Sequence, residues 1–202
     1  MSDTIRPNQV VFLHGTGGDP GDHWWPWLRA EFAKSYYEVW APVLPDNDKP
    51  NQETYWNFLM SRGVDFEDVV LVGHSSGATT VLNLLMDDRF PRVRAAVLVG
   101  VFLNQNLTSR REDFEKDQFV DLFPKNGFDW NVIKRKADNF YFVHGDDDPY
   151  CEYEDTVKAS ERLGGELITI KSGGHLTSRF GIVELPQLTA VLKHDGLLDE
   201  NH

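Results

Sequence analysis

Six continuous apolar runs recur along the chain, separated by longer stretches with helical patterning. Runs that are continuous rather than alternating are typical of strands buried on both faces of a parallel sheet. Their alternation with helices predicts a three-layer α/β domain. The expected strands are 10–13, 39–41, 69–72, 95–99, 140–143 and 167–170. The expected helices are 24–34, 52–62, 76–86, 152–163 and 182–193.

Residues with special backbone preferences mark the ends of several helices. Asp22 is expected to cap the first helix, whose first turn contains Pro26. Gly63 and Gly164 stand where helices should end, because glycine adopts the left-handed conformation of a helix C-terminus. Pro186 must lie in the first turn of the last helix or kink it, so the start of that helix is uncertain by several residues.

One connection is much longer than the others. Residues 102–136 exceed the usual length of a strand–helix loop and carry several aromatic side chains among charges. Two interpretations stay open and are compatible: a helical crossover with one buried face, or a small cap over the substrate site. The aromatic residues are Phe114, Phe119, Phe123, Phe128 and Trp130.

Length and charge exclude several classes of protein. The 202 residues suit a single domain, 1–202, and 32 acidic against 20 basic residues give a net charge of −12, which repels nucleic acid. The longest apolar run, 95–103, is too short for a membrane span. The N-terminus has no apolar targeting segment, and the single cysteine fits a reducing compartment. We therefore expect a cytoplasmic protein without membrane or nucleic-acid partners, and leave a protein partner open.

The strongest chemical signal is Gly73–Gly77, which reads Gly-His-Ser-Ser-Gly. This Gly-x-Ser-x-Gly pattern follows an expected strand and opens an expected helix, the context of a nucleophile elbow. The sharp turn holds its serine in a strained conformation, and side chains at either glycine would collide with a neighbouring strand or helix. Ser75 is thus the candidate nucleophile at a helix N-terminus, where an anionic intermediate is favoured.

A serine nucleophile needs a base, and the base needs a carboxylate to orient it. The candidate base is His175, which follows the last expected strand after two glycines. The carboxylates 146–148 follow the strand before it, which gives the order Ser, Asp, His of α/β-hydrolases. Asp148 is favoured because it stands three residues after Gly145 and precedes a proline, while Asp147 is the alternative; the remaining aspartates would form the turn as solvated charges.

The first strand ends in a glycine-rich turn at 14–18. Such a turn can bind phosphate, but the third glycine of a dinucleotide site and the lysine of a P-loop are missing. The other interpretation is an oxyanion hole, in which the backbone N–H groups of Thr16 and Ser76 converge on the developing negative charge.

Other candidate features carry weaker signals. His144 with the carboxylates 146–148 could bind a metal, but neighbouring residues rarely point at one ion, so we expect no metal. Cys151 is expected to be a small buried side chain. Three early tryptophans could line the pocket or pack a helix on the sheet, and adjacent ones cannot all point the same way: Trp24, Trp25 and Trp27.

Several of these segments together resemble the small serine hydrolases typified by retinoblastoma-binding protein 9. The matching segments cover nearly the whole chain: 13–18, 23–28, 73–77, 147–149 and 174–175. The resemblance implies a compact α/β-hydrolase fold with a small cap and a parallel six-stranded sheet, ordered 2-1-3-4-5-6. It also implies Ser75 as nucleophile, the aspartate before Pro149 as acid and His175 as base. The chain departs from the family in two ways. The loop with the candidate acid continues after Pro149 without the second proline often present in the family. The Leu-x-Cys-x-Glu motif, which would support binding to a pocket protein, is absent from the sequence.

Together these features predict a serine hydrolase that cleaves a small carboxylic ester, or an amide or thioester, without cofactor or metal. Two alternatives remain. The chain could be a non-catalytic interaction module on a hydrolase scaffold, or a triad enzyme of another reaction type, such as a C–C hydrolase or a cofactor-free haloperoxidase.

Overall fold

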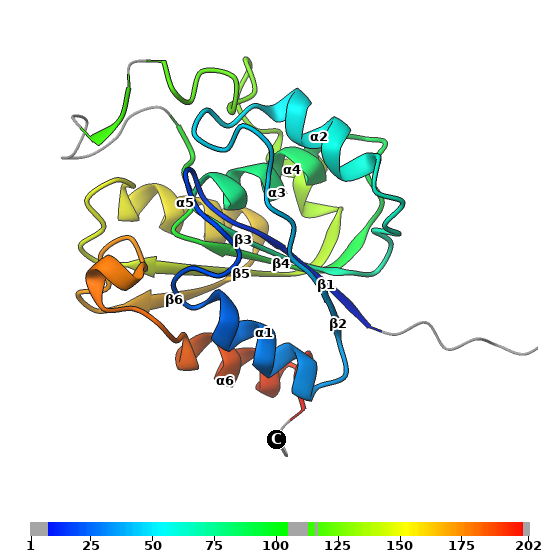
Figure 1. Ribbon diagram of the computed structural model, residues 1–202, viewed down its shortest axis with the longest axis vertical. Coiled ribbons are helices and arrows are strands. Elements are labelled where there is room, and N and C mark those ends of the chain that lie inside the picture. The colour runs from blue at the N-terminus through cyan, green and yellow to red at the C-terminus, as the bar shows by residue number, and fades with distance from the viewer. Residues whose placement is uncertain (1–7, 105–112, 116, 200–202) are drawn as a thin grey trace, which may run out of the picture.

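A six-stranded, entirely parallel sheet forms the centre of the protein (Figure 1). The computed structural model describes residues 8–104, 113–115 and 117–199. The strand order β2-β1-β3-β4-β5-β6 confirms the predicted order. The strands are β1 (Gln9–Leu13), β2 (Glu38–Trp40), β3 (Val70–His74), β4 (Val93–Val99), β5 (Ala137–Gly145) and β6 (Glu166–Ile170).

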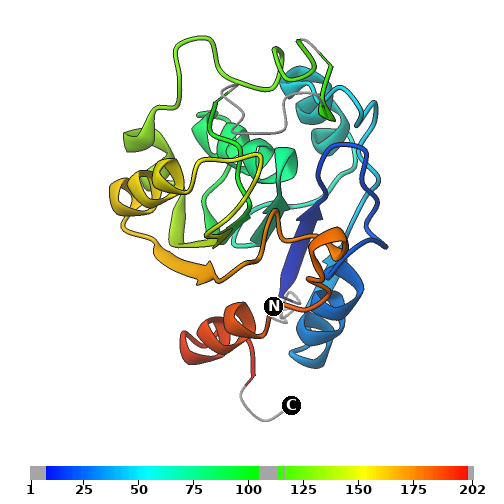
Figure 2. The same ribbon diagram turned by 90° about the vertical axis from the view of Figure 1, so that its left-hand side faces the viewer.

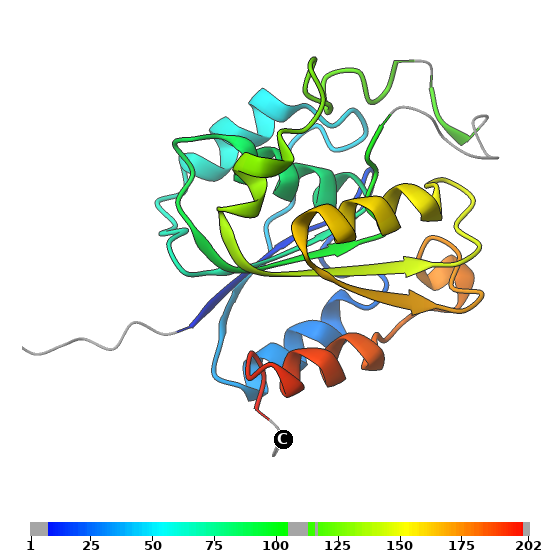
Figure 3. The ribbon, with the colours of Figure 1, turned by 180° about the vertical axis from the view of Figure 1, so that it is seen from behind.

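Helices cover both faces of this sheet, which confirms the three-layer architecture (Figures 1 and 3). On one face α1 (Trp25–Lys34) and α6 (Pro186–His194) pack against the sheet through one apolar cluster. The helices α2 (Gln52–Met60), α3 (Ser76–Met86), α4 (Trp130–Lys134) and α5 (Tyr153–Leu163) cover the other face. The strands β1, β3, β4 and β5 contribute to both clusters, as their continuous apolar runs predict. Within the described ranges, no helix has the length and apolarity needed to cross a membrane.

The helix ends agree only in part with the sequence signals. Gly164 ends α5 in the left-handed conformation, and Pro186 is the first residue of α6, as predicted. The prediction that Asp22 caps α1 is wrong, because Trp24 occupies the capping position and Asp22 instead accepts a hydrogen bond from the N–H of Asp19. The short helix α4 lies within the connection 102–136, for which a helical crossover was one interpretation, and Asp129 caps it by accepting two backbone hydrogen bonds.

The long connection 102–136 supplies a third, smaller apolar cluster beside the carboxyl ends of the strands. Phe102, Phe119 and Leu122 are buried there with Tyr150 and Cys151 from the loop after β5. Part of the predicted cap, 105–112 and 116, lies outside the described residues. The described part shows both a buried aromatic face and side chains that reach the candidate site described next.

Candidate functional site

Ser75 occupies a sharp turn between β3 and α3. Its backbone has φ of 56°, a left-handed conformation that costs energy for a residue with a side chain. A Cβ on Gly73 would lie 2.5 Å from the Cα of Ala78, and one on Gly77 would lie 2.0 Å from the carbonyl oxygen of Leu13. Both glycines are therefore required by close approach of the backbone, as the elbow pattern predicts.

The structure brings Ser75, His175 and Asp148 into one hydrogen-bonded chain. His175 Nε2 lies 2.9 Å from Ser75 Oγ, and His175 Nδ1 lies 2.7 Å from Asp148 Oδ2. The three residues come from the ends of β3, β6 and β5, and all three are buried. Parallel strands end on one edge of a sheet, which is why residues 27 and 100 positions apart in sequence meet here.

Asp148 is held as an ionised acceptor. Its Oδ1 accepts backbone hydrogen bonds from Tyr150 at 2.8 Å and Cys151 at 3.1 Å, while Oδ2 faces His175. Burial alone would raise the pKa of Asp148, but the charge and hydrogen bond of His175, together with the backbone N–H of Tyr150, outweigh burial and lower the pKa. The carboxylate is thus available to orient the imidazole at neutral pH.

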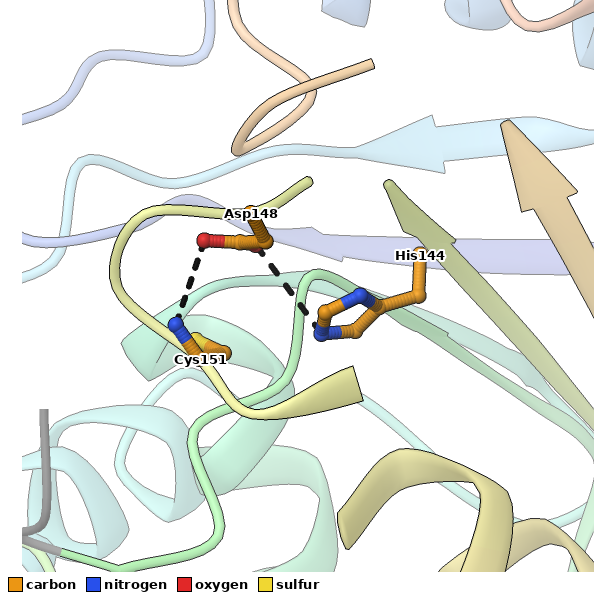
Figure 4. A group of neighbouring side chains, drawn as sticks. All are labelled: His144, Asp148 and Cys151. Carbon is orange, nitrogen blue, oxygen red and sulfur yellow. Dashed lines mark hydrogen bonds and ion pairs between the residues drawn. The ribbon is translucent and has the colours of Figure 1, made fainter. Parts of the chain in front are cut away.

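Behind Asp148 lies a buried group that could in principle ligate a cation (Figure 4). His144 Nε2 lies 3.9 Å from Asp148 Oδ2, and Cys151 completes the group. His144 Nδ1 donates to the carbonyl of Gly145, so its Nε2 faces the carboxylate as a bare acceptor. Both oxygens of Asp148 already accept hydrogen bonds, and Oδ2 also faces His175. Cys151 is buried, as predicted, and burial raises the pKa of its thiol.

The glycine-rich turn after β1 lies directly against Ser75. A Cβ on Gly15 would approach the Cβ of Ser75 to 3.0 Å, so the turn closes tightly over the elbow. The hydroxyl of Thr16 donates to Ser76 Oγ at 2.9 Å and joins the turn to the first residue of α3. The two residues expected to form an oxyanion hole are therefore neighbours.

A pocket of about 440 Å³ opens beside Ser75 and His175. This volume lies within the usual range of small-molecule pockets. Its aromatic lining consists of Trp25, Phe114, Tyr150 and Phe180. Its charged lining consists of Asp19, Asp22, Asp113 and Arg179. Of the three early tryptophans, Trp25 is buried and also borders the pocket, Trp24 is fully buried, and Trp27 packs partly buried on the same apolar cluster.

Two residues at the site were missed by the sequence reasoning, although both stand inside motifs that it singled out. His74 Nε2 donates to the carbonyl oxygen of His175 at 2.9 Å, and Trp24 Nε1 donates to the carbonyl oxygen of Leu176 at 2.9 Å. Burial, together with the charge of His175, lowers the pKa of His74 to about 3, so His74 is a neutral donor. Figure 2 shows the segment after β6 (orange) beside the start of α1 (blue).

Comparison with known proteins identifies the family. Residues 10–194 match the family model described as serine hydrolase. The chain belongs to the serine hydrolase family. This confirms the predicted resemblance, and the protein is an enzyme that acts as a serine hydrolase.

Relatives and solved structures agree along nearly the whole chain. The serine hydrolase RBBP9 of Rattus norvegicus is 24% identical over 190 residues, covering 93% of this chain and 95% of that protein. The crystal structure of YdeN from Bacillus subtilis matches with a TM-score of 0.79 at 22% identity, covering 93% and 97% of the two chains. Est1E from Butyrivibrio proteoclasticus, solved with ferulic acid bound, matches with a TM-score of 0.68 at 17% identity, covering 94% and 88%. The fold is that of the α/β-hydrolases.

Proposed function

We propose that this serine hydrolase cleaves a small carboxylic ester with Ser75 as nucleophile, His175 as general base and Asp148 as the orienting carboxylate. The observation that carries the proposal is the continuous hydrogen-bonded chain from Ser75 Oγ through both ring nitrogens of His175 to Asp148 Oδ2. Nucleophile, base and orienter within hydrogen-bond reach are the geometric signature of activated serine catalysis.

The hydrogen bonds determine which way the proton moves. An ionised Asp148 can only accept, so His175 must carry its proton on Nδ1 and present a lone pair on Nε2. That lone pair takes the proton of Ser75 as Oγ attacks the carbonyl carbon of the ester. The resulting imidazolium then donates the same proton to the leaving alcohol, and the acyl-enzyme is hydrolysed by water in the reverse sequence.

The backbone N–H groups of Thr16 and Ser76 are proposed to hold the oxyanion. Support comes from the hydrogen bond that joins the two side chains and from the tight approach of Gly15 to Ser75. The N-terminus of α3 lies at the same position and favours negative charge. Losing one such donor costs about 10²–10³ in kcat in known serine hydrolases.

The proposed substrate is a small carboxylic ester. A pocket of about 440 Å³ with aromatic walls accommodates a short or aromatic acyl group. Among the structural neighbours are Est1E, whose structure contains ferulic acid, and the carboxylesterase CesB of Bacillus subtilis, with a TM-score of 0.61 at 16% identity, covering 94% of this chain and 84% of that one. Amides and thioesters share the acyl-transfer chemistry and form the second and third groups of a substrate panel.

Labelling with a fluorophosphonate tests the nucleophile. The wild-type enzyme should be labelled, and Ser75→Ala should lose both labelling and ester turnover. Ser76→Ala is the matched control, since it changes the adjacent hydroxyl but keeps the backbone N–H, and it should remain labelled. Labelling that persists in Ser75→Ala would contradict the proposal.

An asparagine scan of 146–148 tests the carboxylate. Asparagine keeps the size of the side chain but can impose the wrong imidazole tautomer, so Asp148→Asn should lower kcat by up to about 10⁴. Asp147→Asn should retain most activity, because its carboxylate does not contact the ring. The reverse result would make Asp147 the orienter.

A further inference from the structure

The loop that carries His175 is conformationally strained. Ser172 and Leu176 have φ of 52° and 53°, in the left-handed region that residues with side chains rarely adopt. Gly174 between them also has positive φ, and a Cβ there would meet the ring of Phe180 at 2.3 Å. A loop of this kind does not hold its shape by backbone preference alone, so other contacts must hold the imidazole in place.

The three consecutive aspartates each bind a different point of this loop. Asp146 Oδ1 accepts from the N–H of Ser172 at 2.7 Å, and Asp147 Oδ1 accepts from the N–H of Gly174 at 2.7 Å. Asp148 Oδ2 accepts from the ring of His175 at 2.7 Å. The two side chains expected to be solvated turn formers are thus hydrogen-bonded to the loop, although both remain exposed.

The two loops can approach this closely because Gly145 precedes the aspartates. A Cβ on Gly145 would lie 2.2 Å from the carbonyl oxygen of Gly174, so any other residue would push the loops apart. The backbone N–H of Asp146 also donates to the carbonyl of Ile170 at 3.2 Å, where the loop leaves β6. The loop that carries the three aspartates therefore runs along the His175 loop and contacts it at several points, not only through the side chain of Asp148.

On its other side the loop is held by ring N–H donors. Trp24 binds the carbonyl of Leu176, and His74 binds the carbonyl of His175. Both donors are fully or almost fully buried, whereas Asp146 and Asp147 face solvent. The His175 loop is thus held between a buried pair of donors and an exposed pair of carboxylates.

We propose that Asp146 and Asp147 are positioning residues for the general base: they hold the backbone of the His175 loop, while Asp148 orients the ring. The proposal rests on the proposed function of His175. Neither residue lines the pocket or contacts Ser75, so both act through His175 alone. The contact of Asp147 should affect the position of His175 more than that of Asp146, because its partner Gly174 adjoins His175 directly, whereas Ser172 lies three residues away.

The chemistry separates a positioning carboxylate from an orienting one. A backbone N–H needs only an acceptor, which the amide oxygen of asparagine supplies as well as a carboxylate does. Orientation of the imidazole needs a group that can only accept, because the NH₂ of an asparagine side chain can donate to the ring nitrogen and favour the wrong tautomer. Positions 146 and 147 should therefore tolerate asparagine but not alanine, whereas position 148 should tolerate neither.

The experiment compares alanine and asparagine at each position, by ester kinetics and thermal unfolding. Asp147→Ala should lower kcat about three- to tenfold with KM unchanged, because a displaced base slows the chemistry without altering the pocket. Asp147→Asn should restore kcat to within about twofold of wild type. Asp146→Ala should lower kcat by about twofold, also with asparagine rescue.

A double variant distinguishes positioning from a general loss of structure. In a His175→Ala background there is no base to position, so adding Asp147→Ala should not lower the residual rate further. An equal fold-loss in both backgrounds, or a wild-type kcat for Asp147→Ala, would overturn the proposal. Loss of rate in Asp147→Asn as large as in Asp147→Ala would also overturn it. Failure of the proposed function would be recognised separately, by a Ser75→Ala variant that still turns over ester.

Discussion

The proposed nucleophile and base of the candidate triad are held by different sets of contacts. Ser75 lies in a turn where the backbone fits only because two glycines lack side chains, and its neighbours are backbone atoms of β1 and α3. His175 lies in a loop held by hydrogen bonds on both sides, two of which its backbone N–H groups donate to exposed carboxylates. Steric exclusion holds the first residue, whereas the second depends on polar contacts in addition to the close approach at Gly145 and Gly174.

This difference predicts how each region responds to change. Close-packed backbone cannot shift by a few tenths of an ångström. A substitution at the elbow should therefore either leave the stability of the fold unchanged or unfold the protein, with little in between. Hydrogen bonds can be removed one at a time, so changes around His175 should give graded losses of rate. The predictions below test that contrast, starting with the largest expected effect.

Adding one methyl group at the elbow should be severely destabilising. A Cβ on Gly77 would lie 2.0 Å from the carbonyl oxygen of Leu13 and 2.5 Å from that of His14, which belong to β1 and its end. Gly77→Ala should lower the free energy of unfolding by about 3 kcal/mol or more, which corresponds to a fall in melting temperature of about 6–12 °C in a thermal unfolding experiment.

Gly21→Ala is the matched control for this substitution. Its Cβ would meet only the side-chain oxygen of Asp19 at 3.1 Å, an exposed contact that costs at most the hydrogen bond from the N–H of Gly21 to that oxygen. A change in melting temperature of the same size in both variants would show that the elbow is not the more rigid region.

His74 links the two regions, since it ends the strand before Ser75 and donates to the loop of His175. Its pKa is about 3 in the folded protein against about 6.5 in the unfolded chain, so the unfolded chain binds more protons between these values. The free energy of unfolding should therefore fall as the pH drops from 6.5 toward 3, with a contribution from this residue on the order of 1 kcal/mol per pH unit.

Glutamine at position 74 provides the measurement. It places a donor where Nε2 stands but does not titrate, so His74→Gln should have a shallower pH dependence of stability in urea unfolding between pH 4 and 6. His14 and His144, whose pKa values burial also lowers, remain in the variant and leave some slope. Equal slopes for variant and wild type would mean that His74 is not held neutral. Above pH 7 the two curves should run parallel.

Trp24 tests the buried side of the polar anchoring. Trp24→Phe keeps an aromatic ring in the apolar cluster but leaves the carbonyl of buried Leu176 without its donor. We expect a loss of about 1–3 kcal/mol in stability and a fall in kcat of about threefold, with KM unchanged. Trp27→Phe, in the helix that follows Trp24 and on the same apolar cluster but only partly buried, should retain kcat. Equal kinetics for the two variants would remove Trp24 from the anchoring of the base.

The sequence predicted those parts of the molecule that depend on local patterns. The six strands follow from continuous apolar runs, and the elbow follows from two glycines in a strand–turn–helix context. The order of the strands was implied by the resemblance to a known family rather than by the runs themselves. Gly164 and Pro186 marked helix ends because their backbone preferences are intrinsic. At Asp22 the local signal failed, because its side chain binds the N–H of Asp19 in the preceding turn instead of capping α1.

The rest depended on which residues meet across long stretches of chain. Asp147 and Gly174 stand 27 positions apart, and nothing in either segment states which N–H each carboxylate will face. The indole of Trp24 reaches a carbonyl 152 positions away, so its sequence context indicated packing but not a hydrogen bond. Three consecutive aspartates and a glycine-rich loop nonetheless indicated hydrogen bonds of this kind, since the backbone N–H groups of such a loop need acceptors.

The smallest effect that we expect lies at Ser172, where strain can be removed without touching a hydrogen bond. Its φ of 52° is unfavourable for serine and ordinary for glycine, and the residue is exposed. Asp146 binds only its backbone N–H, which glycine retains. Relief of this strain in Ser172→Gly should therefore raise the melting temperature by about 1–3 °C and leave kcat unchanged. The extra conformational entropy that glycine gives the unfolded chain keeps the gain in stability small.

A double variant tests whether polar anchors hold this loop against its strain. If they do, Ser172→Gly should also reduce the loss of kcat caused by Asp146→Ala, because a loop that prefers its shape needs less anchoring. Purely additive effects of the two changes on kcat would show that strain at Ser172 and the contact of Asp146 are unrelated.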